Sequence, residues 1–223
     1  MIRRVVLLLS VLTALAACST AVRGSATPVQ HPTTRAPVPA TGEAAAGCPE
    51  PTALPECLMP LPAGSAAWSQ MYAPNGTISI DQYLDRVYYG VSADQRSAVR
   101  SALATEGLLS IAHESWSTNS DAADVVLLRF GTASGAASRN AQNVHAYTAD
   151  TADYRAVPIP ALTRLGVNVV AYQKIDSQGD MASIGFGSFG AVLVEFFFWS
   201  PATVDQAPLS DWVTQQARAL GSD

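Results

Sequence analysis

Residues 108–130 read LLSIAHESWSTNSDAADVVLLRF, two apolar segments on either side of a polar one. Leu108–Trp116 and Asp124–Phe130 are rich in aliphatic and aromatic residues, as strands are, and Ser117–Asp121 has the polar residues of a turn. Strands joined by so short a turn pair in the antiparallel sense. The segment therefore predicts an antiparallel hairpin at the centre of the fold.

Three further strands are predicted closer to the C-terminus. They are Val167–Ile175, Met181–Phe186 and Ala191–Trp199, separated by turns at Ser177–Asp180 and Gly187–Gly190. Short turns again imply antiparallel neighbours. We expect one mainly antiparallel sheet of about five strands.

Helices are predicted by their capping residues and their apolar spacing. Ser79–Gln82 and Ser92–Gln95 both read S-x-x-Q, the capping-box pattern at the start of a helix. Thr132 can cap an Ala-rich helix from Ala133 to about Tyr147. Its expected apolar stripe contains Ala137, Ala141 and Val144. A last helix is expected near Pro208, with a stripe of Leu209, Trp212, Val213 and Leu220.

These elements predict an α+β fold in which helices pack on one sheet, similar to an α-β-α sandwich. From Asp124 onward, the strand Val125–Phe130, the Ala-rich helix and the closing helix with Trp212 resemble actinobacterial lipoproteins of the sensor-domain or PsbP-like kind. That resemblance implies binding of a ligand or partner at the cell surface rather than catalysis.

The N-terminus has the features of a signal peptide. Arg3 and Arg4 precede the apolar run Val5–Ala17, which ends in Leu15-Ala16-Ala17-Cys18. Thirteen residues of helix span about 20 Å, short of the roughly 30 Å hydrocarbon core of a bilayer. The motif resembles the lipobox of bacterial lipoproteins, which implies cleavage after residue 17, lipidation of Cys18 and a place on the outer face of the cell membrane. An ordinary signal peptide with a chance cysteine is the alternative.

The rest of the chain divides by composition. Residues 18–47 are rich in Ala, Thr, Pro, Ser and Gly, contain no aromatic residue, and predict a disordered lipidated tether. Residues 48–77 form a Pro-rich approach that begins with Cys48 and Cys57. We expect a disulfide between these two cysteines, because the compartment is oxidising and neither CxxC spacing nor further metal ligands occur nearby. Residues 78–223 are the expected globular domain.

Charge and composition exclude some functions. The chain has 13 basic and 18 acidic side chains, a net charge of −5, and loss of Arg3 and Arg4 with the leader makes it more acidic. An acidic chain is unsuited to nucleic acid, which binds through clustered Lys and Arg. Lys174 is the only lysine, and this bias towards arginine, with abundant alanine, is typical of a GC-rich actinobacterial genome.

The sequence offers weak signals for catalysis. Gly185–Gly190 matches G-x-G-x-x-G, but a predicted strand follows it where a dinucleotide site needs a helix, so we expect a glycine-rich hairpin and no cofactor. No G-x-S-x-G occurs. His113 and His145 are the histidines of the domain, and without a second ligand at close spacing neither predicts a metal site.

Glu195 is the most unusual residue of the domain, because it lies within the apolar run VLVEFFFW at residues 192–199. A carboxylate among such neighbours needs a partner or a cleft. Arg129 is the first candidate partner and Lys174, which shares a strand face with Tyr172, is the second. The four residues predict either a structural ion pair or a small polar cleft walled by aromatic side chains.

The sequence thus predicts a membrane-anchored extracytoplasmic domain that binds a small molecule or an envelope protein and catalyses nothing. A cell-envelope hydrolase using His113 or Glu195 is one alternative. A structural envelope assembly protein is the other.

Overall fold

A computed structural model of the chain describes residues 48, 52–67, 74–88, 90–119, 121–150, 153–172, 180–201 and 206–221. The predicted signal peptide (1–17) and tether (18–47) lie outside these residues.

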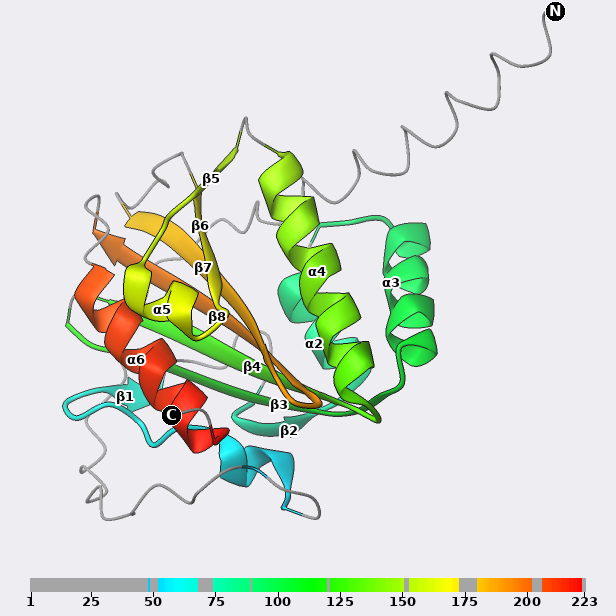
Figure 1. Cartoon of the computed structure of the whole chain (residues 1–223), viewed down its shortest axis with the longest axis horizontal. Coiled ribbons are helices and arrows are strands. Elements are labelled where there is room, and N and C mark those ends of the chain that lie inside the picture. The colour runs from blue at the N-terminus through cyan, green and yellow to red at the C-terminus, as the bar shows by residue number, and fades with distance from the viewer. Residues whose placement is uncertain are drawn as a thin grey trace, which may run out of the picture.

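The described residues contain one eight-stranded sheet, in the order β1-β3-β4-β8-β7-β6-β5, with β2 also paired to β3 (Figure 1). The strands are β1 (Ala66–Ala67), β2 (Gly76–Ile78), β3 (Leu108–Ser117), β4 (Ala122–Phe130), β5 (Tyr154–Ala156), β6 (Asn168–Tyr172), β7 (Asp180–Phe189) and β8 (Val192–Pro201). Each described pair of neighbouring strands is antiparallel. The prediction of a mainly antiparallel sheet is confirmed.

The predicted number of about five strands was too low. The five expected strands are β3, β4, β6, β7 and β8, and β1, β2 and β5 are added to them. Each of the three has only two or three residues, too few for an alternating pattern to be recognised in the sequence. Because β1 and β2 pair with β3, the segment at residues 48–77 contributes to the sheet itself.

The helices are η2 (Leu54–Cys57), α2 (Ile80–Val87), α3 (Ala93–Thr105), α4 (Ala133–Ala149), α5 (Pro160–Arg164) and α6 (Gln206–Ala219). Both capping boxes are present, since Ser79 and Gln82, and likewise Ser92 and Gln95, exchange hydrogen bonds. Helix α5 was not predicted. It is a single turn begun by Pro160, in a segment that reads as irregular.

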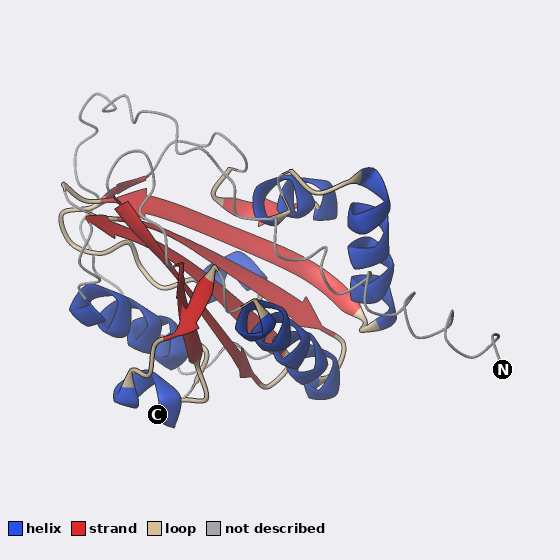
Figure 2. Ribbon diagram, turned by 90° about the horizontal axis from the view of Figure 1, so that it is seen from above, coloured by secondary structure: helices blue, strands red, loops and turns tan. Residues whose placement is uncertain are grey.

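Helices cover both faces of the sheet (Figures 1 and 2). One apolar core lies under η2, α5 and α6 and includes Leu54, Leu162 and Trp212. The other lies under α2, α3 and α4 and includes Tyr83 and Leu103. The fold is therefore an α-β-α sandwich, as expected.

Helix α4 is rotated from its predicted orientation. Ala137 and Ala141 are exposed, while Ala136, Arg139 and Asn143 are buried. Alanine gains little from burial, so the hydrogen bonds of the two polar residues determine which face points inward. The start of α4 also needs Gly135, because a Cβ there would lie 2.2 Å from the carbonyl oxygen of Glu106.

Candidate functional site

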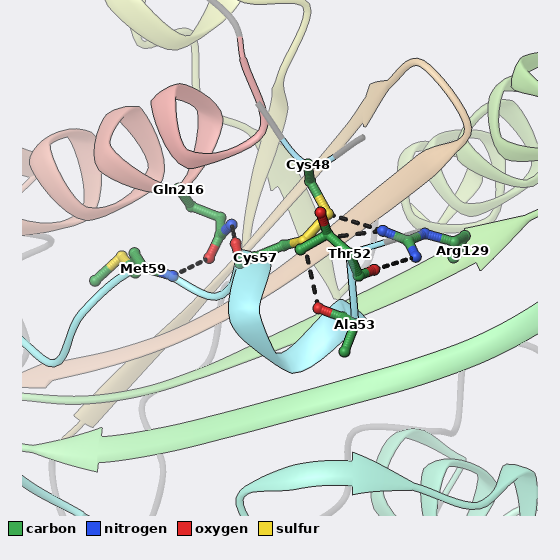
Figure 3. Close-up of a disulfide and its surroundings, with 7 residues drawn as sticks. All are labelled: Cys48, Thr52, Ala53, Cys57, Met59, Arg129 and Gln216. Atoms are coloured by element: carbon green, nitrogen blue, oxygen red, sulfur yellow. Dashed lines mark hydrogen bonds between the residues drawn. A yellow bond between two sulfur atoms is a disulfide. The ribbon is translucent and has the colours of Figure 1, made fainter. Parts of the chain in front are cut away.

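The disulfide between Cys48 and Cys57 is present, with the two Cα atoms 5.5 Å apart, as the sequence predicts. It closes a loop that lies against the sheet and α6 (Figure 3). Gln216 of α6 accepts a hydrogen bond from the backbone N–H of Met59 at 2.9 Å and donates to the carbonyl of Cys57 at 2.8 Å. Gln216 is fully buried, so both hydrogen bonds are shielded from water.

Arg129 belongs to this loop and not to Glu195. Its guanidinium donates to the carbonyl of Thr52 at 2.7 Å and to the Sγ atom of Cys48 at 2.8 Å (Figure 3). Arg129 therefore holds the disulfide loop on β4.

The predicted pairing of Arg129 with Glu195 is wrong, because the two side chains point to opposite faces of the sheet. Strands β4 and β8 pair with Val126 opposite Glu195 and Arg129 opposite Val192. Side chains alternate along a strand, so Glu195 lies on the face covered by α2 and α4 and Arg129 on the face covered by η2 and α6. The register between two strands cannot be obtained from one strand's composition.

Glu195 is 1% exposed and has hydrogen-bond partners from two helices. The hydroxyl of Tyr83 in α2 donates to its Oε1 and Oε2 atoms at 3.0 and 3.1 Å. Asn143 Nδ2 of α4 donates to Oε1 at 2.7 Å. Burial raises the pKa of Glu195, while the positive charge of Arg139 and the two hydrogen bonds oppose that rise.

Arg139 of α4 lies near Glu195 and contacts Tyr88. Its guanidinium donates to the hydroxyl of Tyr88 at 2.7 Å, directly after the end of α2. Burial alone would lower the pKa of Arg139, but the Tyr88, Tyr83 and Glu195 side chains together raise it, so its positive charge is retained.

A second polar contact joins α2 to the sheet. Arg86 forms an ion pair with Asp124 of β4. The Cζ atom of Arg86 lies 5.5 Å from the ring centroid of Phe197 and 5.4 Å from that of Trp199, both in β8. These rings stack on one another at an interplanar angle of 20°. The guanidinium is thus held by one carboxylate and two aromatic rings.

His113 lies beside this ion pair without a hydrogen bond to it. Its Nδ1 atom donates to the carbonyl of Pro74 at 3.1 Å, and its Nε2 atom is 3.6 Å from Asp124 Oδ1, beyond hydrogen-bond distance. Burial lowers the pKa of His113, and the nearby charge of Arg86 adds to that effect. His113 is therefore neutral near pH 7.

Together these contacts define what we call the α2 polar layer, in which α2 and its C-cap contact β4, α4 and β8. Its members are Tyr83, Arg86 and Tyr88 from α2 and its C-cap, and Asp124, Arg139, Asn143 and Glu195 from β4, α4 and β8. Of this set, the sequence pointed only to Glu195. Arg139 and Asn143 carried a usable signal. They lie four residues apart, so on one face of a helix that is rich in alanine.

The remaining predicted residues lie elsewhere. Tyr172 pairs with Tyr154 in the sheet, but its side chain, Lys174 and Cys18 are outside the part of the chain that the structure describes. His145 is exposed on α4. The described hydrogen bonds of Glu195 go to Tyr83 and Asn143, so no histidine or serine is found with it as a hydrolase would need. Within the described ranges, no group of three His, Cys, Asp or Glu residues could hold a metal ion.

Gly185–Gly190 leads into a hairpin, as predicted, but the turn is shorter than the predicted Gly187–Gly190, because β7 continues to Phe189. The first five residues of the segment belong to β7, and the chain turns at Gly190, whose φ is +57°, before β8. The glycines permit close packing, since a Cβ on Gly187 would lie 2.8 Å from Val167 Cγ2.

Comparisons with known proteins leave the family open. No family model matches the chain, and no curated protein matches it. Among solved structures, the extracellular domain of PknH from Mycobacterium tuberculosis is similar at 10% sequence identity, with a TM-score of 0.42. The match covers 54% of this chain and 66% of that chain, just under two thirds. A likeness this weak supports no statement about function.

Within the described ranges, no helix has the length and apolar character needed to cross a membrane.

Proposed function

We propose that the protein is a lipoprotein anchored to the outer face of a bacterial membrane, where its domain binds a ligand or an envelope protein at the α2 polar layer and catalyses nothing. Two features support the location. The sequence up to Cys18 has the order of charges, apolar residues and small residues of a lipobox. The disulfide between Cys48 and Cys57 fits an oxidising compartment outside the cytoplasm.

Replacing Cys18 with alanine is expected to remove the protein from the membrane fraction, because lipid attachment needs this thiol. The variant should appear in the medium or as an uncleaved precursor of higher mass. Fractionation of the producing cells followed by immunoblotting measures this. The matched control is a serine at Cys48, which leaves the anchor unchanged and should stay with the membrane. A processed Cys18→Ala protein that remains membrane-bound would contradict the anchor.

The proposal for binding rests on one observation, the way in which α2 is attached. Tyr83, Arg86 and Tyr88 connect this helix to β8, β4 and α4 by polar contacts. A helix of eight residues is not stable by itself, so its position depends on these polar contacts together with the burial of Leu84 and Val87. Hydrogen bonds and ion pairs can be exchanged for those of a ligand at little net cost, while the buried side chains of Leu84 and Val87 stay in the core.

The test is native mass spectrometry of the full-length lipidated protein, extracted in mild detergent from the membranes of the bacterium that makes it. A bound molecule or protein should be retained. Tyr83→Phe removes one hydroxyl from the α2 polar layer and should reduce the bound fraction severalfold. Arg155→Ala, at an exposed position in β5, should retain it. Equal binding by both variants would contradict the assigned place, and the absence of any retained component would favour the structural assembly protein.

A further inference from the structure

The environment of Arg86 resembles a binding site for a cation. The side chain of Arg86 is 16% exposed, and that of Asp124 is only 2% exposed. The carboxylate and the two rings approach the guanidinium from neighbouring strands. Such a combination of a buried carboxylate and flat aromatic faces suits a planar cation, because a guanidinium stacks on rings while its N–H groups bind the carboxylate.

The carboxylate and the rings come from two paired strands and not from α2. Asp124 is opposite Phe197 in the register of β4 and β8, and Ala122 is opposite Trp199. The three side chains therefore lie side by side because the strands pair there. Only the cation comes from a helix, and that helix is short.

Asp124 also constrains what can replace Arg86. Removing the cation from a buried carboxylate leaves an unpaired charge in the interior, which destabilises the folded protein. His113 does not compensate, since its Nδ1–H bonds to Pro74 and its Nε2 atom is 3.6 Å from the carboxylate. Departure of Arg86 is therefore favourable only when another cation enters, and the acidic net charge of −5 attracts one.

We propose that Asp124, Phe197 and Trp199 form a guanidinium-binding site, which Arg86 fills in the free protein and from which the guanidinium group of a ligand or partner displaces it. This inference rests on the proposed function and names the chemistry that the α2 polar layer recognises. Displacement releases Arg86 and with it one of the contacts that hold α2 on the sheet.

The first experiment opens the site by Arg86→Ala in the full-length protein and titrates it with N-ethylguanidinium at millimolar concentrations. The thermal unfolding midpoint should rise saturably for this variant. It should not rise for the Arg86→Ala/Asp124→Asn double variant or for Arg96→Ala, whose lost arginine pairs with Asp85 on the surface. Ethylammonium should bind at least tenfold more weakly than N-ethylguanidinium. No saturable effect, or an equal effect in the double variant, would overturn the site.

If Arg86→Ala does not fold, Arg86→Lys serves instead, because it keeps the charge but lacks the planar group. It should bind N-ethylguanidinium more tightly than the wild type, because the apparent affinity rises with the fraction of molecules in which the site is vacant, and lysine fills the site less well than arginine. Equal affinities would count against the proposal.

The second experiment tests displacement in the wild type by hydrogen exchange at residues 80–87. Arginine amide, or a ten-residue peptide with one central arginine, should speed exchange in α2, and the citrulline counterparts should not. Tighter binding of the peptide would indicate a protein partner, and equal binding a free guanidino compound. If neither arginine probe alters α2, displacement is wrong. The titration measures the site alone, so it can fail while a native component still binds at α2.

Discussion

Glu195→Ala is expected to lower the free energy of unfolding by about 3 to 5 kcal/mol. The substitution removes a negative charge that offsets the buried charge of Arg139, and it removes the acceptor of the Tyr83 and Asn143 hydrogen bonds. Denaturant unfolding of the full-length protein, followed by circular dichroism, measures the loss. Glu195→Gln keeps an oxygen acceptor and is expected to cost less, about 1 to 3 kcal/mol.

Double-mutant cycles identify the partners of Glu195. Glu195→Ala combined with Tyr83→Phe should show a coupling energy of about 0.5 to 3 kcal/mol, because the two side chains are in contact. Combined with Arg129→Ala it should be additive within about 0.5 kcal/mol, because Arg129 lies across the sheet. A loss below about 1 kcal/mol for Glu195→Ala, or strong coupling to Arg129, would contradict the arrangement of the α2 polar layer.

Removing the disulfide is the second large effect expected. The Cys48→Ser/Cys57→Ser variant should lose about 2 to 3 kcal/mol, the chain-entropy contribution of a closed loop of this size. Wild-type protein treated with reductant should unfold at the same denaturant concentration as this variant. Alkylation with mass detection, before and after reduction, verifies that both thiols are paired. Unchanged unfolding after full reduction would show that the crosslink does not stabilise the domain.

Arg129 gives this prediction an independent control. Arg129→Ala removes the hydrogen bonds to Thr52 and Cys48 but leaves the crosslink intact. Its cost should add only partly to that of the cysteine variant, because both changes loosen the same loop.

Local sequence patterns predicted the parts of this fold that local physics determines. The capping boxes at Ser79 and Ser92 lie within four residues each, and the strand pair at residues 108–130 is joined by its own turn. The crosslink from Cys48 to Cys57 spans only ten residues. In each case the interacting groups are close in the sequence, so their types and spacing sufficed.

Most residues of the candidate site could not be predicted from the sequence, because their contacts join segments that are far apart in the chain. Tyr83 and Glu195 are 112 positions apart, and Asn143 and Glu195 are 52 apart. Which of Arg129 and Arg139 lies on the same face of the sheet as Glu195 depends on the register of β4 against β8 and on the rotation of α4, and neither is encoded in a single element. The oddity of a carboxylate in VLVEFFFW correctly indicated a polar contact, but not its partner.

The loop around the crosslink determines how the domain would respond to mechanical force. A pull along the chain from its N-terminal side enters at Cys48, and the crosslink carries it directly to Cys57. From there Arg129 distributes the load to β4 and Gln216 distributes it to α6. Strand β1, with only two residues on the sheet's edge, would peel off easily if it bore the load alone. Because the load reaches the middle strands first, a pull from the N-terminal side would not unravel the domain from its edge.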